Sequence, residues 1–315
     1  MRTGKLVLGA TLVLAALAVP ATADARTTGD RSGGYGTVAA TPDTPAAQAR
    51  RAEAVAKFRE LHEIRKARNA GVVAPGAQAA TAPGLAAAQL HHFWGVEPTN
   101  ASGDGLQATQ SVVPTWKTSK DGDFMYTPTM KPPGGSCIEI TTAYWRYNGA
   151  NTNEVWAWDW CGEGGPKKEV NIDAAFLAKY TTTVDGRPAY TVKVERTVVA
   201  SNTWTAYLFN VQTNAWDTFY TQKGTDKSEL PYGWDIFEFY ASKNPATGQA
   251  YYCADMPATG FDSSGIKVRK NGVWSPATAA NSPWEPYVNP TGSTYWCNTL
   301  KFQKIGANDR WTVRK

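Results

Sequence analysis

The chain has 315 residues, which is enough for one large domain or two modest ones. Its hydrophobic fraction of 42% and aromatic fraction of 12% are ample for a packed core. The net charge of +5 does not indicate nucleic-acid binding, because basic residues crowd into residues 50–68 and leave the remainder close to neutral.

The first 25 residues have the pattern of a secretory signal peptide. Arg2 and Lys5 form a charged start, residues 6–19 form an apolar run, and residues 21–25 offer small side chains for cleavage. The apolar run is too short to span a bilayer, and no later run is long enough. We therefore predict a secreted, extracellular protein without a membrane anchor.

Residues 26–90 differ in composition from the rest, since the first of the thirteen tryptophans is Trp94. Residues 26–44 are small, polar and rich in glycine, which predicts disorder. Residues 44–70 carry apolar side chains at helical spacing and predict a basic amphipathic helix. Residues 71–88 form an Ala/Gly/Pro linker. Three interpretations of the helix stay open: a pro-segment that docks on the mature domain, a membrane-surface helix, or a spacer.

Beyond residue 91, short alternating runs between turn signals predict strands and no long helix. About a dozen such runs suit an all-β fold, an antiparallel two-sheet sandwich of concanavalin-like or jelly-roll form over residues 91–315. After a hairpin over 136–161, the predicted strands are 176–183, 189–196, 203–209, 216–222, 234–240, 250–254, 265–270, 273–275, 295–302 and 310–314. Asp185-Gly186 and Asn271-Gly272 are predicted turns between strands.

Four cysteines in an exported chain predict two disulfides. Three connectivities are open, and we favour sequential pairing, because it closes one hairpin and one C-terminal loop. The predicted bridges are Cys137–Cys161 and Cys253–Cys297. We expect no metal site, since the spacings lack CxxC and no histidine lies nearby. No phosphate loop or dinucleotide fingerprint occurs, so we expect no cofactor.

The hairpin over 136–161 suggests a site for acid–base chemistry. Turn-forming residues at 147–153 predict a long loop. If the two cysteines lie opposite each other, Glu139 lies opposite Asp159, and the tryptophans of 156–160 lie on the other face with branched apolar residues. Two carboxylates at about 4.5–5.5 Å between their Cβ atoms repel each other unless a proton or a cation intervenes. The alternative is a solvent-facing pair that nearby Lys or Arg side chains relieve.

The histidine count limits the chemistry. His62, His91 and His92 are the only histidines, and we expect none of them inside the strand-rich body, so a serine or cysteine nucleophile with a histidine base is excluded. Catalysis would then depend on carboxylates. Glu238 is a second candidate, because aromatic residues flank it in the predicted strand 234–240 and partial burial suits a carboxyl group to general-acid work. The alternative is an edge-strand glutamate.

Aromatic residues among Pro, Asn and Ser near the C-terminus suggest a carbohydrate surface, because sugar faces stack on flat apolar rings. The candidate substrate-binding residues are Trp158, Trp274, Trp284, Tyr287 and Trp296. The tryptophans of the hairpin also suit a sandwich core, in which aromatic rings are common.

Five segments carry strand motifs in a defined order: residues 137–139, 154–160, 189–195, 204–210 with Thr213-Asn214, and 233–238. This order resembles the secreted glutamic peptidases of the eqolisin and neprosin type. The resemblance implies a catalytic role for Glu139, which falls where the family carries a catalytic Gln or Glu. Gly233 precedes Trp234 where the family motif has its second glutamate, and a shifted alignment places Glu238 there. A basic pro-segment before a β-sandwich also fits this family.

We therefore expect a monomeric, carboxylate-dependent hydrolase, a glutamic-peptidase-like endopeptidase that acts on protein outside the cell. One carboxyl group of Glu139 or Glu238 would act as a base toward water and the other as an acid or oxyanion stabiliser, with Asp159 tuning the pair. The alternative is a non-catalytic, lectin-like protein that binds polysaccharide. A structural secreted protein with neither activity is a third possibility.

Overall fold

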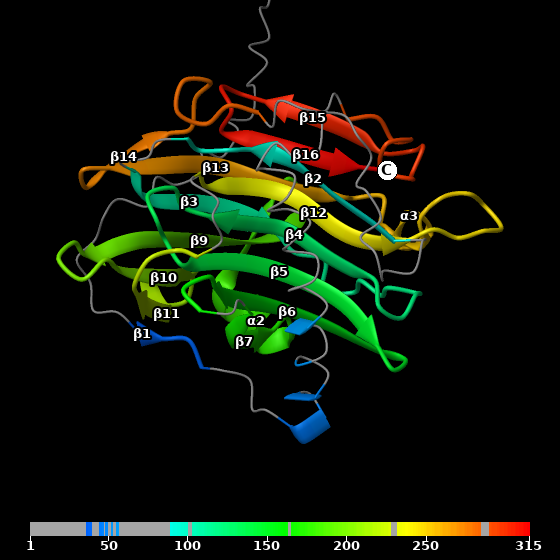
Figure 1. Cartoon of the computed structure of the whole chain (residues 1–315), viewed down its shortest axis with the longest axis horizontal. Helices are drawn as coiled ribbons and strands as arrows, with labels where there is room; N and C mark the ends of the chain where they lie inside the picture. The colour runs from blue at the N-terminus through cyan, green and yellow to red at the C-terminus, as the bar shows by residue number, and fades with distance from the viewer. Residues whose placement is uncertain are drawn as a thin grey trace, which may run out of the picture. The chain divides into compact units, whose positions relative to one another are not determined.

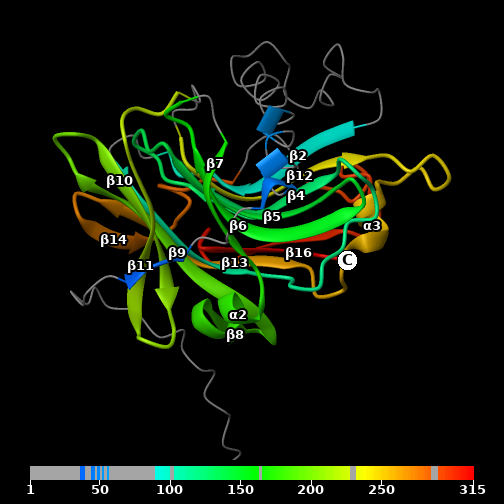
Figure 2. The same ribbon diagram turned by 90° about the horizontal axis from the view of Figure 1, so that it is seen from below.

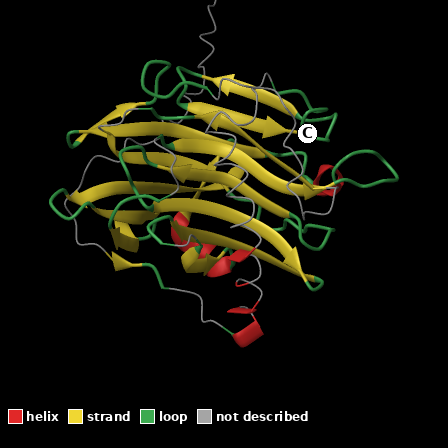
Figure 3. Ribbon diagram, viewed as in Figure 1, coloured by secondary structure: helices red, strands yellow, loops and turns green. Residues whose placement is uncertain are grey.

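Stretches with alternating apolar and polar side chains form the strands of two sheets (Figure 1). The computed structural model describes residues 36–39, 44–46, 48–49, 52, 55–56, 89–99, 103–162, 165–227, 232–284 and 290–315. Figure 3 shows that strands dominate these ranges and that the helices among them are short. The predicted all-β sandwich is confirmed.

Within the described ranges, the larger sheet has ten strands. They are β1 (Gly36–Thr37), β3 (Gly103–Ser111), β8 (Thr181–Val184), β9 (Arg187–Val198), β10 (Thr203–Asn210), β11 (Ala215–Lys223), β13 (Phe261–Lys270), β14 (Val273–Pro276), β15 (Lys301–Ile305) and β16 (Arg310–Arg314). Their order is β1-β11-β10-β9-β3-β13-β16-β15, with β8 paired to β9 and β14 paired to β13. Neighbours are antiparallel, except that β1 runs parallel to β11.

The smaller sheet has six strands in the described part of the chain. They are β2 (Gln89–Val96), β4 (Phe124–Lys131), β5 (Ile138–Tyr147), β6 (Ala150–Asp159), β7 (Pro166–Asn171) and β12 (Trp234–Ser242). The order is β2-β12-β4-β5-β6-β7, and every pair is antiparallel. Figure 2 shows β4 and β5 in one layer and β13 and β16 in the other.

Inward-facing side chains of both sheets form the core between the layers. Val192 and Val194 of β9 belong to the same buried cluster as Ile140 of β5 and Phe237 and Phe239 of β12. Because successive side chains of a strand point to opposite faces, each strand of the smaller sheet also presents a second set of side chains away from this core. That outward set forms a separate buried cluster.

Two segments predicted to be strands are short helices. Residues 176–180 belong to α2 (Ala174–Tyr180), with β8 directly after it, and residues 251–254 belong to α3 (Tyr251–Asp255). The side chain of Asp173 caps α2 by accepting a hydrogen bond from the backbone N–H of Phe176 at 2.8 Å. Phe176 and Tyr180 are both buried, and a separation of four residues fits a period of 2 as well as a period of 3.6. The alternation was therefore misleading.

Four strands before the hairpin were not among the predicted ones, namely β1, β2, β3 and β4. Pro128 lies inside β4, and proline argues against a strand assignment from sequence. The pairing of β4 with β5 shifts between Tyr126 and Thr129, so the proline lies at an irregularity of the ladder. The predicted strand 295–302 was too long, because residues before Lys301 form turns.

The hairpin of β5 and β6 has a two-residue turn instead of the predicted long loop. Asn148 has φ 48° and Gly149 has φ 76°, the positive values that a type I′ turn requires. Tyr147 therefore pairs with Ala150, and counting back along both strands pairs Glu139 with Trp158. The predicted pairing of Glu139 with Asp159 is wrong by one residue, and this slip exchanges the two faces of one strand relative to the other.

Both predicted disulfides are confirmed, Cys137–Cys161 at the open end of this hairpin and Cys253–Cys297 near the C-terminus. The backbone N–H of Trp160 donates to the carbonyl oxygen of Cys137 at 2.7 Å, so the first bridge does not join directly opposed residues. Each bridge contributes about 3–4 kcal/mol in the chain-entropy description. Asp185-Gly186 and Asn271-Gly272 form the predicted turns, with all four φ angles positive.

Residues before the sandwich also contribute to it. β1 lies along the edge strand β11, and Val38 is 1% exposed within the core cluster. The expectation of disorder therefore does not hold for these residues, because pairing with a sheet edge satisfies their backbone. Described residues between 45 and 56 are helical, as predicted. The methyl groups of Val55 lie 3.2 and 3.3 Å from the position that a Cβ atom would take at Gly165.

The predicted signal peptide, residues 1–25, and the linker, residues 71–88, lie outside the described residues. Among the residues that are described, no helix combines the length and the apolar character needed to cross a membrane.

A buried carboxyl group links the two sheets. Asp235 of β12 is fully buried, and it accepts hydrogen bonds from the indole Nε1 of Trp311 at 2.7 Å and from Nε2 of Gln110 at 3.1 Å. Tyr190 continues the network by donating to Gln110. Burial raises the pKa of Asp235 from 3.8 to about 7, and the hydrogen bonds from Trp311 and Gln110 oppose the rise only in part.

As the pH rises from about 4 to about 7, we expect the free energy of unfolding to fall less in the Asp235→Asn variant than in the wild type. In the wild type, the folded state keeps a proton in this window that the unfolded chain releases, so the free energy of unfolding falls as the pH rises. The loss reaches up to about 4 kcal/mol at about 1.4 kcal/mol per pKa unit. Urea unfolding across this window measures the slope, with Asp255→Asn as control. Equal slopes in the wild type and the Asp235 variant would contradict the expectation.

Candidate functional site

The outward face of the six-stranded sheet carries a cluster of aromatic side chains, called here the outer aromatic face. Its aromatic members are Phe93, Phe124, Tyr126, Trp145, Trp156, Trp158, Trp160, Trp234 and Tyr240. The observed register places the tryptophans of β6 on the same face as Glu139, whereas the prediction had placed them on the opposite one. These tryptophans are buried, as a core assignment predicts, but their cluster is separate from the core between the sheets.

Glu139 of β5 is held by three donors from three elements. Thr129 Oγ1 of β4 donates to Oε1 of Glu139 at 2.6 Å, and the indole Nε1 of Trp234 donates to the same oxygen at 2.8 Å. The indole Nε1 of Trp160 donates to Oε2 at 2.9 Å. Both carboxylate oxygens of Glu139 accept hydrogen bonds, as the oxygens of an ionised carboxylate do. The residue is 5% exposed. The three donors fix the orientation of the Glu139 carboxylate.

Glu238 of β12 lies on the same face and is 2% exposed, in agreement with the predicted burial among aromatic rings. Its Oε1 lies 2.8 Å from Nε2 of His91, and the hydroxyl of Tyr240 donates to the same oxygen at 3.2 Å. The imidazole of His91 stacks on the Tyr240 ring with the ring centres 4.1 Å apart. A carboxyl group paired with an imidazole can exchange a proton with it.

The expectation that the strand-rich body holds no histidine is wrong. His91 and His92 both lie in β2, and their side chains are buried. His62 lies outside the described residues. The signal that was missed is the alternation of β2 itself, in which His91 and Phe93 point to one face while His92 and Trp94 point to the core.

Tyr126 of β4 lies among three buried glutamates. Burial raises its pKa well above the ordinary value, and Tyr240, Glu238, Glu139 and Glu154 add to the rise in that order. Glu154 of β6 is 2% exposed and accepts a hydrogen bond from the indole of Trp156 at 2.6 Å. The Tyr126 hydroxyl therefore keeps its proton at neutral pH, and it can donate a hydrogen bond as well as accept one.

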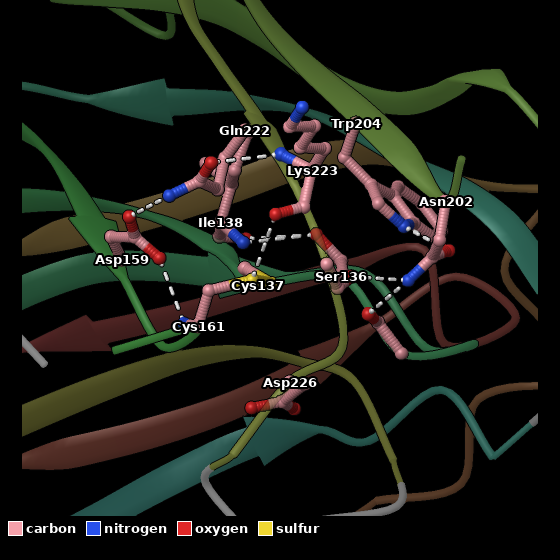
Figure 4. The surroundings of a disulfide bond; sticks show 12 residues. Ser136, Cys137, Ile138, Asp159, Cys161, Asn202, Trp204, Gln222, Lys223 and Asp226 are labelled. Atoms are coloured by element: carbon pink, nitrogen blue, oxygen red, sulfur yellow. Dashed lines mark hydrogen bonds between the residues drawn. A yellow bond between two sulfur atoms is a disulfide. The ribbon is translucent and has the colours of Figure 1, made fainter. Parts of the chain in front are cut away.

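Asp159 lies on the other side of the sheet from Glu139, because it pairs with Ile138, whose side chain is in the core. It accepts hydrogen bonds from the backbone N–H of Cys161 at 2.8 Å and from the Tyr220 hydroxyl at 3.0 Å, and Gln222 also donates to it (Figure 4). These partners belong to the disulfide and to β11. The predicted tuning of Glu139 by a directly opposed Asp159 therefore has no basis in the observed register.

The predicted aromatic surface near the C-terminus is dispersed. Trp284 stacks on Trp94 with ring centres 5.4 Å apart, Trp296 packs against the core beside Lys243, and Trp274 lies in β14. Tyr287 lies outside the described residues. Of the four predicted substrate-binding residues that the structure describes, only Trp158 belongs to the outer aromatic face, where it pairs with Glu139.

Among the described residues, one set of possible metal ligands lies close together, namely Cys137, Asp159 and Cys161. The two cysteines form a disulfide, so neither sulfur is a thiolate that can bind a metal ion. The groups of the outer aromatic face that can exchange or donate protons include the carboxyl groups of Glu139 and Glu238, the imidazole of His91 and the phenol of Tyr126.

No family model matches the chain, and no curated protein matches it. Among solved structures it is similar to scytalido-glutamic peptidase with a peptide-based transition-state analog, at 12% identity and a TM-score of 0.37, and to the same peptidase with a transition-state analog inhibitor, at 11% and 0.38. Each match covers 70% of this chain and 97% of the peptidase.

A third similar structure is SCP-B, a member of the eqolisin family of peptidases in complex with the tripeptide Ala-Ile-His. It has 12% identity and a TM-score of 0.37, and the match covers 70% of this chain and 96% of that one. These neighbours belong to the family that the strand motifs resemble.

We expect Trp160→Phe and Trp234→Phe each to lower the free energy of unfolding by about 1.5–3 kcal/mol, because each removes one hydrogen bond to the buried Glu139 carboxylate. Trp145→Phe is the matched control, since it lies on the same face and its indole nitrogen has no hydrogen-bond partner among the described residues. Urea unfolding measures all three. A control that loses as much stability would show that ring volume, and not hydrogen bonding, sets the effect.

Proposed function

We propose that this protein is a carboxylate-dependent hydrolase, an endopeptidase of the glutamic-peptidase kind. The observation that carries the proposal is the pair of buried glutamates, Glu139 and Glu238, on one aromatic face, each held by named hydrogen-bond partners. Burying such groups costs free energy unless they are paired. A face that keeps three of them, with Glu154 as the third, is more easily explained by chemistry than by packing.

The two glutamates differ in their partners, which supports different roles for them. Glu139 accepts hydrogen bonds from three donors and would act as the general base toward a water molecule. Glu238 lies within hydrogen-bond distance of the His91 imidazole, with which it can exchange a proton, and it would supply the proton that the leaving amine needs. The Tyr126 hydroxyl, between them in electrostatic reach of both, would donate to the oxyanion of the tetrahedral intermediate.

An extended segment of an unfolded protein is the substrate class that suits this face. The rings of Trp158 and Trp160, the two most exposed tryptophans of this face, would contact the apolar side chains of such a segment. Trp158 lies directly opposite Glu139 in the ladder. Two disulfides and the predicted signal peptide support action outside the cell, where disulfides persist.

The helical segment between residues 45 and 56 is proposed to be a pro-segment that docks on the mature domain. Val55 contacts Gly165, which precedes β7 and accepts a hydrogen bond from the backbone N–H of Asp159 at 2.9 Å. The contact therefore lies next to the end of β6 that carries Trp158 and Trp160. A segment docked there would limit access to Glu139.

Carbohydrate binding through the C-terminal aromatic residues is the less favoured proposal. A sugar platform needs several rings on one accessible surface, and Trp274, Trp284 and Trp296 pack against different parts of the fold. Retention of the processed protein on insoluble polysaccharide, lost on Trp284→Ala, would favour this alternative.

We expect Glu139→Gln and Glu238→Gln each to lower kcat for an unfolded protein substrate by at least about 100-fold, because each removes one partner of the acid–base pair. Digestion across acid to neutral pH with the processed wild type measures this effect. Asp262→Asn is the control, as it removes a buried, ion-paired carboxylate of β13 on the other sheet. It should lower stability and leave kcat within about twofold. Absence of cleavage by folded, processed wild type would refute the peptidase proposal.

We expect Val55→Asp to increase peptidase activity of the full chain by about tenfold or more, since a lost valine contact of about 1.5–3 kcal/mol shifts a docking equilibrium by that factor. Ala52→Asp is the matched control, because Ala52 is exposed on the same helical segment. Initial rates before processing, and hydrogen exchange in β6, report the change. Equal rates in both variants would show that this helix does not limit access.

A further inference from the structure

A buried lysine lies beside the indole groups that hold Glu139. Lys131 ends β4, and its side chain is 1% exposed. Its Nζ lies 2.6 Å from Oδ2 of Asp226 and 5.0 Å from the centre of the Trp234 ring, its cross-strand neighbour. A lysine is rarely buried unless its charge is paired, and a cation over an indole face attracts the ring. Lys131 therefore fixes the position of Trp234.

The partner of Lys131 comes from the segment that leaves the other sheet. Asp226 follows β11 by three residues, and Figure 4 shows it on the segment that continues from Lys223 past the disulfide. This segment is itself anchored, because Asn202 donates to the carbonyl oxygen of Gly224 and the N–H of Gly224 donates back to Asn202 at 3.4 Å. Its course is therefore tied to the ten-stranded sheet.

The same segment also holds the second indole donor. The backbone N–H of Lys227, next to Asp226, donates to the carbonyl oxygen of Trp160 at 2.9 Å. Two adjacent residues thus fix both indoles, Asp226 through the ammonium of Lys131 and Lys227 through the backbone of Trp160. The two indoles bind different oxygens of the Glu139 carboxylate, so the orientation of that carboxylate depends on this segment.

We infer that Lys131 and Asp226 are positioning residues, whose ion pair aligns the Trp160 and Trp234 indoles so that the Glu139 carboxylate faces the substrate in one orientation. The catalytic consequence rests on the proposed function of Glu139, whereas the alignment of the indoles does not. An ion pair that only joins the two sheets would contribute to stability without affecting the orientation of the indoles. The two cases therefore differ in whether loss of the pair changes the environment of the Trp160 and Trp234 indole N–H groups.

The test uses the full chain with ¹⁵N-labelled tryptophan and the variants Lys131→Met, Asp226→Asn and Lys131→Arg. Trp160→Phe and Trp234→Phe assign the two indole N–H resonances. We expect Lys131→Met and Asp226→Asn to move or broaden both resonances together, and to lower kcat by at least about tenfold with little change in KM, because a misplaced catalytic group loses rate more than binding. Lys131→Arg keeps the positive charge, so its indole resonances and its kcat should lie closer to the wild-type values than those of Lys131→Met.

Lys193→Met is the matched control. Lys193 of β9 is also a buried lysine, with its Nζ 2.9 Å from Glu195 and 4.7 Å from the centre of the Trp216 ring, on the other sheet. Its loss should lower the thermal midpoint as Lys131→Met does, but leave the Trp160 and Trp234 resonances and kcat unchanged. If Lys131→Met does not fold, the double variant Lys131→Met with Asp226→Asn removes both charges of this ion pair together.

Unchanged indole resonances in folded Lys131 and Asp226 variants would overturn the inference, as would an equal shift in the Lys193 variant. An active wild type with unchanged kcat in both variants would also overturn it. If the indoles move together but the wild type cleaves no protein, the positioning role stands and the proposed peptidase function fails.

Discussion

The turn of Asn148 and Gly149 fixes the pairing of β5 with β6, and the outer aromatic face depends on that pairing. A type I′ turn of two residues allows a single register, in which Tyr147 meets Ala150. Because side chains alternate, this register decides on which face each carboxylate lies. Glu139 joins the tryptophans of β6, and Asp159 joins the polar contacts between the sheets.

Once the tryptophans and Glu139 share a face, the cost of burying the carboxylate has to be offset there. The indoles of Trp160 and Trp234 supply the donors, so the same side chains that make the face apolar also stabilise its charge. The buried Lys131–Asp226 pair belongs to this arrangement. The ammonium group of Lys131 lies over the Trp234 ring, and the backbone N–H of Lys227, next to Asp226, donates to the carbonyl oxygen of Trp160.

Parts of this site were predictable from local patterns. Glu238 was identified because aromatic residues flank it in an alternating strand, whereas Glu139 was identified through an assumed pairing with Asp159 that is wrong by one residue and through the resemblance to glutamic peptidases. Both disulfides followed from chain order and hairpin closure. The partners were not predictable. His91 lies 147 positions from Glu238, and Trp234 lies 95 positions from Glu139, so only the order of strands in the sheet brings them together. The missed helix α2 shows that local patterns can also fail within a single element, because seven residues are too few to separate a period of 2 from one of 3.6.

The sequence alone determined that the chain is mostly strand and that its glycine-containing turns reverse it, because turn chemistry and alternation are local properties. Which face each group occupies, and which donors reach it, was decided only by tertiary structure. A register differing by one residue is nearly invisible in composition, yet it moves Asp159 from the site to the far side of the sheet. Sheet order joins β2, β12, β4 and β5, and no local signal encodes contacts between strands so distant along the chain.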